Sequence, residues 1–202
     1  MTQTRLRLLA VAAACIATLG AVPAYAAQTV YTTTLTGPQE ATPNASPGIG
    51  LGIVTLDDSS FTMRVQTVFF GLTGTVTASH IHCCTAVPGT GTAGVATMTP
   101  TFLGFPSGVT QGAYDHTFDM TLASSWNGAF VTAHGGTTAG AFSALHTGLD
   151  SGSAYLNIHS TTFGGGEIRG FLAGPVPEPQ TYALMLAGLG MLGWTAKRRQ
   201  RL

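Results

Sequence analysis

Two stretches of this chain alternate between apolar and polar side chains with a period of two. In residues 60–70 and 114–122 almost every second residue is apolar, and most of the residues between them are polar. A β-strand with one buried face produces this alternation, because successive side chains point to opposite sides of the sheet. The side chains that we expect to face the core, from these stretches and a third one, are Tyr114, Phe118, Met120, Phe61, Met63, Val65, Leu156 and Ile158.

Weaker strand patterns recur between these stretches and around them. They cover residues 29–35, 49–56, 75–83, 94–97, 129–133, 154–159 and 167–172. Clusters of Gly, Pro, Asn and Ser separate them, and only residues 138–146 favour a short helix. Many short strands without regularly interspersed helices predict an all-β fold, an antiparallel β-sandwich or barrel. Residues 27–175 show no internal repeat, so we expect them to form one β domain.

The C-terminal residues 176–202 combine three features of a processing signal. Pro177, Glu178 and Pro179 form a short box, residues 181–196 are largely apolar, and four basic residues lie among the last six. At about 1.5 Å per residue, the apolar helix would be about 24 Å long, which is short for a bilayer core of about 30 Å. The basic end stays on the cytoplasmic side, so the preceding domain faces outward.

This tail resembles the PEP-CTERM sorting signals of Gram-negative bacteria, which membrane-embedded exosortases recognise at the Pro-Glu-Pro box. The resemblance implies that an exosortase-type enzyme is a partner and that processing involves Pro177, Glu178 and Pro179. It also implies a protein that is held transiently in the inner membrane by its C-terminal hydrophobic helix. The processed protein would then reach the cell surface or the extracellular matrix. An ordinary C-terminal membrane anchor is the alternative.

Residues 1–26 have the parts of a helical signal peptide. Two arginines precede an apolar run, and Ala24-Tyr25-Ala26 is a small-x-small cleavage site. We therefore expect cleavage after Ala26. A lipoprotein site at Cys15 fits less well, because cleavage there would fall inside the apolar core of the signal.

Removing both ends changes the charge of the chain. Residues 27–175 keep two basic residues, Arg64 and Arg169, against seven acidic residues, which gives a formal net charge of −5. This charge and the lack of a basic patch argue against nucleic acid as a partner. The cysteines of this domain are the adjacent Cys83 and Cys84. They can close a small ring in an oxidising compartment, stay as thiols, bind a soft metal or cross-link molecules.

A His-x-His pair and one distant histidine are the best candidates for chemistry. His80 and His82 lie in one expected strand, so their side chains point the same way about 7 Å apart, and His159 lies in another strand. Three imidazoles gathered from two strands are a common site for copper or zinc. In the structural alternative each histidine contacts a backbone carbonyl or Glu167, and no cofactor is bound. Both interpretations place the three histidines close together.

Five short motifs follow one another along the expected β domain. They are Leu35-Thr36-Gly37-Pro38-Gln39-Glu40, Gly71-Leu72, His80-Ile81-His82, Tyr155-Leu156-Asn157-Ile158-His159-Ser160 and Gly166-Glu167-Ile168-Arg169-Gly170. In this order they resemble the CHRD domain, a module that is named for chordin and common in bacterial exported proteins. The resemblance covers about residues 30–173 and implies an immunoglobulin-like all-β fold. It marks Tyr155, Asn157, Glu167, Arg169 and Gly170 as motif positions. We interpret Glu167 and Arg169 as a structural ion pair, or Arg169 as a donor to loop carbonyls.

Catalytic motifs of the common hydrolases, phosphate-binding loops and helical zinc proteases are missing from the sequence. We therefore favour a non-enzymatic protein of the cell surface or biofilm matrix, which contacts extracellular polysaccharide or surface proteins. The alternative is an exported protein that binds copper or zinc through its histidines. The His-x-His tripeptide is similar to that of copper–zinc superoxide dismutases, but the further ligands of that enzyme have no clear counterparts.

Overall fold

The computed structural model describes residues 28–174, 186–192 and 197. The expected cleavage site at Ala26 and the Pro-Glu-Pro box at 177–179 lie outside the described residues. Residues 186–192 are helical and belong to the expected C-terminal helix. Among the described residues, no helix has the length and apolar character needed to span a bilayer.

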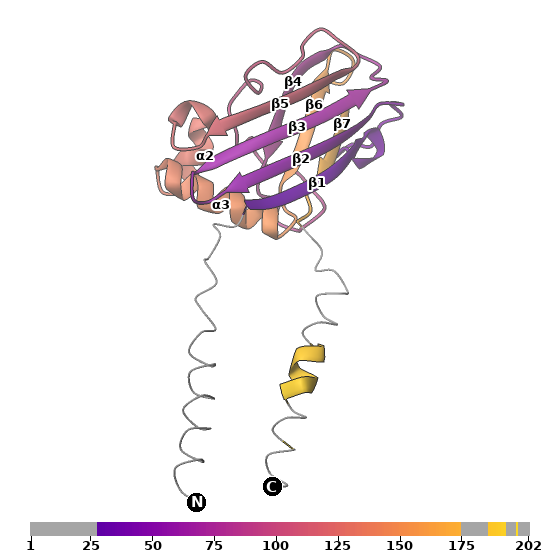
Figure 1. Ribbon diagram of the computed structural model, residues 1–202. Helices are drawn as coiled ribbons and strands as arrows, with labels where there is room; N and C mark the ends of the chain where they lie inside the picture. The colour runs from indigo at the N-terminus through magenta and orange to yellow at the C-terminus, as the bar shows by residue number, and fades with distance from the viewer. Residues whose placement is uncertain (1–27, 175–185, 193–196, 198–202) are drawn as a thin grey trace, which may run out of the picture.

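Seven strands form one antiparallel sheet in the order β4-β6-β7-β1-β2-β3-β5. Their bounds are β1 Gln28–Thr36, β2 Ile49–Asp57, β3 Thr62–Phe70, β4 Val76–His82, β5 Gly112–Asp119, β6 Tyr155–Ser160 and β7 Ile168–Phe171. The sheet curls into a half-barrel, with β4, β6 and β7 behind β3, β2 and β1 in Figure 1. The expected all-β fold of the sandwich or barrel type is confirmed.

The register of the sheet explains the alternation in the sequence. Val54 lies opposite Val65, and Met63 lies opposite both Leu56 and Phe118. Residues that are directly paired point to the same face, so these side chains meet in the core. Seven of the eight predicted core side chains are buried, namely Tyr114, Phe118, Met120, Met63, Val65, Leu156 and Ile158.

Phe61 is the exception among the predicted core residues. Its side chain is 41 % exposed, and its backbone has a φ of 50° in the turn between β2 and β3. The turn ends the alternation one residue before β3 begins, so the period of two no longer decides where Phe61 points. Its ring instead packs against that of Phe142, with the two ring centroids 5.2 Å apart.

The helices lie at one end of the half-barrel (Figure 1). Residues 129–133, predicted as a strand, form α2 (Gly128–Ala133) instead, because Asn127 caps the helix by accepting a hydrogen bond from the Ala129 amide. The expected helix at 138–146 is present as α3, which runs longer, over Thr138–Asp150. Two short 3-10 turns are η1 Gly37–Gln39 and η2 Ala123–Ser125.

The predicted strand at residues 94–97 is reduced to isolated bridges. Val95 pairs with His82 and Thr97 with Trp126, so this segment borders the free edge of β4 without extending the sheet. The amides of Ala96 and Phe102 donate to carbonyls of β4 at this edge. The segment therefore holds the outer edge of the strand that carries the His-x-His pair.

A row of polar and aromatic side chains crosses β4, β6 and β7 on the face away from the core. His80 lies opposite Asn157, which in turn lies opposite Arg169, and His82 lies opposite Tyr155. Four of these five side chains are buried, and His82 is half-buried, although they do not face the core. Loops that cover this part of the sheet shield the row from solvent and complete the site described next.

Candidate metal centre

The strands β4 and β6 bring three histidines together on one face. His80 and His82 are two residues apart on β4, and His159 lies on β6 opposite Ala78. The ring centroid of His80 lies 4.7 Å from that of His82 and 4.8 Å from that of His159. The centroids of His82 and His159 are 6.1 Å apart. The expected proximity of the three histidines is confirmed.

Each imidazole is anchored through its Nδ1 atom to a loop carbonyl. His80 Nδ1 lies 3.0 Å from the Pro100 oxygen, and His82 Nδ1 lies 2.9 Å from the Ala93 oxygen. His159 Nδ1 lies 2.9 Å from the oxygen of Gly164 in the same way. A carbonyl oxygen only accepts, so each Nδ1 carries the hydrogen, and each neutral ring then has its lone pair on Nε2.

The three Nε2 atoms point toward a common space. His80 Nε2 and His159 Nε2 are 3.0 Å apart, and the three candidate ligand atoms all lie within 4.8 Å of one another. His82 Nε2 is buried and has no hydrogen-bond partner. Three lone pairs that face each other without a donor between them are unfavourable in a buried site, and a cation would relieve this repulsion.

The electrostatics of the cluster favour the neutral, metal-ligating form of the rings. Burial, reinforced by the neighbouring imidazoles, lowers the pKa of His80 to about 4. Burial likewise lowers the pKa of His82 to about 4, and it lowers the pKa of His159. A tetrahedral ion with Zn–N distances of about 2.0–2.1 Å separates its ligand nitrogens by about 3.4 Å. The Nε2 atoms of His80 and His159, 3.0 Å apart, are already near this spacing, and ligand atoms at the 4.8 Å limit of the cluster would have to close by about 1.4 Å.

Tyr155 and Arg169 support the ring of His82 from the side. The Tyr155 ring stacks on His82 with centroids 4.6 Å apart and planes 8° from parallel. Arg169 Cζ lies 4.7 Å above the Tyr155 ring, and its Nη1 donates to the Gly91 oxygen at 3.0 Å. Arg169 Nε donates to the Gln39 oxygen. The stack therefore fixes the plane of His82, as outer-shell groups do around metal ligands.

Arg169 contacts loop carbonyls, as one of the two sequence interpretations expected, and Glu167 is not its partner. The carboxylate closest to Arg169 is that of Glu40, with Arg169 Nε 3.9 Å from Glu40 Oε2. Glu167 instead accepts hydrogen bonds from the Ser46 hydroxyl at 2.6 Å and from the amides of Thr73 and Gly74. None of the three imidazoles bonds to Glu167 among the contacts of the described residues.

Glu40 and Asn157 form a second buried polar group beside the histidines. Glu40 Oε1 and Asn157 Oδ1 are both buried without a hydrogen-bond partner. Burial raises the pKa of Glu40 to about 7, although Arg169 opposes the shift. The sequence reasoning assigned no role to Glu40, and the available signal was its position at the end of the 35–40 motif.

Two motif positions serve the fold that carries the site. A Cβ atom at Gly170 would collide with Thr33 and Thr34, so glycine lets β7 approach β1. A Cβ at Gly166 would lie 2.7 Å from both Glu40 carboxylate oxygens and from Asn157 Nδ2, and its φ is 131°. Glycine at this position leaves room for the contact between Glu40 and Asn157.

Comparison with known protein families identifies two segments. The CHRD domain matches residues 31–172, and the PEP-CTERM protein-sorting motif matches residues 175–200. No curated protein and no solved structure gave a significant match. The sorting motif marks a protein of a Gram-negative bacterium that is exported and processed at the membrane by an exosortase. The chain, a curled β-sheet domain with a cluster of three histidines under its loops, belongs to the CHRD domain family.

Proposed function

We propose that this exported CHRD protein binds one copper or zinc ion through the Nε2 atoms of His80, His82 and His159. The supporting observation is the arrangement of the lone pairs. Each Nδ1 donates to a loop carbonyl, so all three Nε2 lone pairs converge, and that of His82 is buried without a partner. Neutral imidazoles suit both copper and zinc, and three protein ligands leave a coordination position open for water or another ligand.

A metal titration of the full chain tests this proposal. The protein is first treated with a chelator and then titrated separately with Cu²⁺ and Zn²⁺ in a calorimeter, with bound metal measured after gel filtration. We expect about one equivalent of bound metal for the native chain. The His80→Asn/His82→Asn double variant should bind none at this site, because asparagine lacks the imidazole lone pair.

A matched control separates ligand loss from a general effect of removing histidine. His116 is half-buried on β5, outside the cluster, and His116→Asn should leave metal uptake unchanged. Circular dichroism checks that each variant remains folded. Equal uptake by the native chain and a folded double variant would overturn the proposal, and the structural interpretation of the three histidines would then stand.

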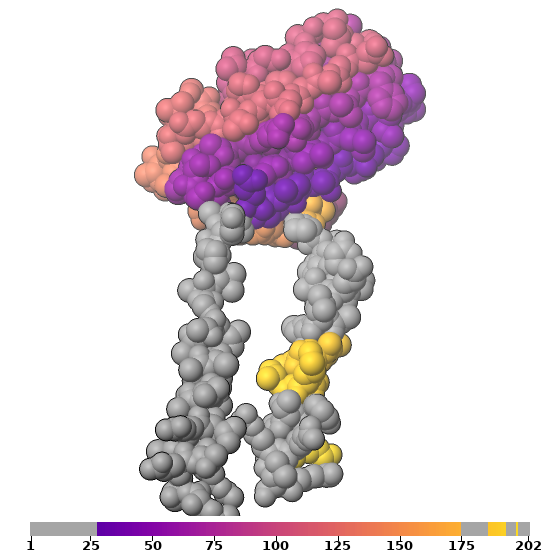
Figure 2. All heavy atoms as spheres, in the orientation of Figure 1, coloured from indigo at the N-terminus to yellow at the C-terminus, as the bar shows by residue number. Residues whose placement is uncertain are grey.

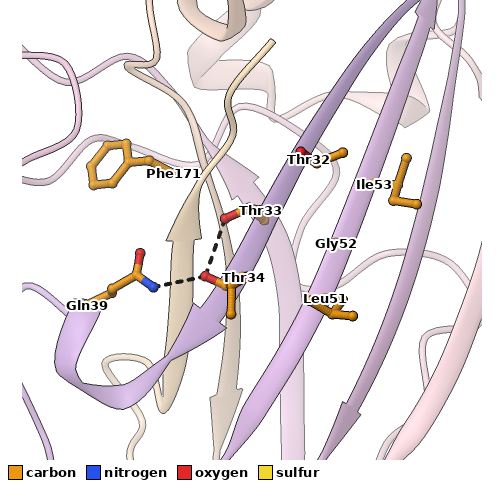
Figure 3. Close-up of a pocket in the computed structure, with 8 residues that line it drawn as sticks. All are labelled: Thr32, Thr33, Thr34, Gln39, Leu51, Gly52, Ile53 and Phe171. Atoms are coloured by element: carbon orange, nitrogen blue, oxygen red, sulfur yellow. Dashed lines mark hydrogen bonds between the residues drawn. The ribbon is translucent and has the colours of Figure 1, made fainter. Parts of the chain in front are cut away.

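A second proposal concerns the surface-layer role that we favoured from the sequence. The chain acts as a non-enzymatic binding component of the cell surface or matrix, and it contacts neutral polysaccharide. The supporting observation is a cavity of about 590 Å³ on the exposed face of the sheet. Its lining is free of charged side chains and consists of Thr32, Thr33, Thr34, Gln39, Leu51, Gly52, Ile53 and Phe171 (Figure 3).

The cavity offers the groups that bind sugars. The Phe171 ring lies on one side and Leu51 and Ile53 lie on the other (Figure 3), with threonine hydroxyls between them. The Gln39 amide is held in place by donating to the Thr34 oxygen at 2.9 Å. An aromatic ring provides a stacking surface, and hydroxyl and amide groups exchange hydrogen bonds with sugar hydroxyls.

Polysaccharide binding is tested by affinity electrophoresis of the full chain in gels that contain dextran, a neutral polymer, or alginate, an acidic one. Dextran should slow migration of the native chain, and Phe171→Ala should abolish the shift. Phe70→Ala is the control, because Phe70 is also exposed on the sheet but does not line the cavity. No shift in dextran, or an equal shift for Phe171→Ala, would contradict the proposed sugar site.

A further inference from the structure

The Cys83–Cys84 pair forms a disulfide directly after β4, on the side of the strand away from the histidines. The two sulfurs differ in environment. Cys83 is 4 % exposed and belongs to the hydrophobic core, whereas Cys84 is exposed. A thiol in solution therefore reaches the sulfur of Cys84 first. When it attacks there, the buried sulfur of Cys83 is the leaving group.

The disulfide forms part of the wall of a cavity on α3. This cavity has a volume of about 490 Å³ and is lined by Cys84, His134, Gly140, Ser143, Ala144, Thr147, Gly148, Ser151 and Ser153. Gly148 makes the arrangement possible, because a Cβ atom there would collide with the sulfurs of both Cys83 and Cys84. A side chain at position 148 would occupy the space of the two sulfurs and would hold the helix backbone away from the disulfide.

We propose that the Cys83–Cys84 disulfide is a thiol–disulfide exchange site, which reacts through this cavity with a small dithiol or a pair of protein cysteines. The incoming thiolate bonds to Cys84 Sγ, the bond between Cys84 and Cys83 breaks, and Cys83 leaves as a thiolate that takes up a proton. The second thiol of the reductant then attacks the reductant sulfur that is bonded to Cys84. This step closes a disulfide within the reductant and releases Cys84 as a thiol. Two electrons pass from the dithiol to the protein, and the reductant leaves as a disulfide.

Two groups in the cavity assist these steps. His134 lines the cavity, and its Nδ1 donates to the Phe130 oxygen at 2.8 Å, so its Nε2 keeps a lone pair that can accept the proton of a thiol entering the cavity. Thiolate formation is required for attack, and a nearby base raises the thiolate fraction. After reduction the Cys84 thiol can donate to the Ala144 oxygen, which lies 3.7 Å from Cys84 Sγ.

The position of attack provides the first test. The native, metal-free full chain is pulsed with reduced glutathione and quenched with N-ethylmaleimide, and fragmentation mass spectrometry is applied to the peptide that contains Cys83 and Cys84. We expect glutathione on Cys84 and the maleimide on Cys83, with a preference of at least about tenfold over the reverse product. The chain unfolded in guanidinium serves as reference, and there the two products should form in similar amounts.

The rate of exchange provides the second test. His134→Gln should slow reduction by dithiothreitol several-fold while circular dichroism shows an unchanged fold, and His116→Gln, outside the cavity, should leave the rate unchanged. A disulfide that becomes reducible only as the β signal in circular dichroism is lost would overturn the proposal. Attack mainly on Cys83 would also overturn it, and an unchanged rate in His134→Gln would refute the role of His134.

Discussion

The pKa values of the two buried glutamates of the domain are shifted in opposite directions, so only Glu40 should make stability depend on pH above pH 5. Glu40 is 6 % exposed and has an unpartnered carboxylate oxygen, and burial raises its pKa from 4.5 to about 7. Glu167 has no exposed surface, but its hydrogen bonds outweigh the effect of burial and lower its pKa. Replacing each residue by glutamine removes its titration and leaves the volume of the side chain nearly unchanged.

The sign of each effect follows from proton linkage. Between pH 4.5 and about 7 the folded state holds the Glu40 proton more tightly than the unfolded state does, so native stability falls as pH rises. A shift from 4.5 to about 7, at about 1.4 kcal/mol per pKa unit, sets a ceiling of about 3 kcal/mol on this loss. Relaxation of the site reduces it, and we expect about 1–3 kcal/mol.

Urea unfolding of the metal-free full chain between pH 5 and pH 8.5 measures the effect as a difference between variant and native protein, so that titration of the histidines cancels. The stability of Glu40→Gln relative to the native chain should rise by about 1–3 kcal/mol over this range. Glu167→Gln should be less stable than the native chain by a nearly constant amount, because its carboxylate is ionised throughout. A pH-independent difference for Glu40→Gln would refute the reasoning.

Two further predictions concern the core and the processing of the chain. Phe118 is 5 % exposed, and its ring centroid lies 5.4 Å from that of Phe102. Phe118→Ala should therefore lower the free energy of unfolding by about 3–5 kcal/mol. A loss below about 1 kcal/mol would contradict this prediction and show that the core closes around the smaller side chain. In cells that contain an exosortase, the intact mass of the surface-exposed protein should correspond to a chain that begins at Ala27 and lacks the segment after the Pro-Glu-Pro box. A main mature species that retains residues 197–202 would contradict this prediction.

The strands could be predicted because their signal is local. Alternation in β3 and β5 identified both the strands and the buried side of each, and the turn at Phe61 marks where that signal ends. The error at α2 has the same origin. Its residues are small or apolar and suit either a strand or a helix, and the cap from Asn127 decides between them.

The histidine cluster could be predicted only in part. Spacing placed His80 and His82 on one face, and the strand pattern at residues 154–159 placed His159 in a distant strand. The groups that orient the three rings are backbone carbonyls of Ala93, Pro100 and Gly164. Carbonyls carry no sequence signal, so the direction of each Nε2 lone pair became apparent only once the loops were in place.

The way the chain leaves the sheet has a mechanical consequence. Ala173, directly before the tail, exchanges two backbone hydrogen bonds with Thr32 of β1, and β7 lies between β6 and β1 in the interior of the sheet. Figure 2 shows the indigo to magenta segment that contains β1 to β3 as broad bands across the visible face of the domain. A pull that reaches Ala173 therefore loads a strand that is bonded on both sides, to β6 and to β1, and not on one side alone. A tether at an edge strand could be unzipped one bond at a time, whereas this one transmits tension into the centre of the sheet.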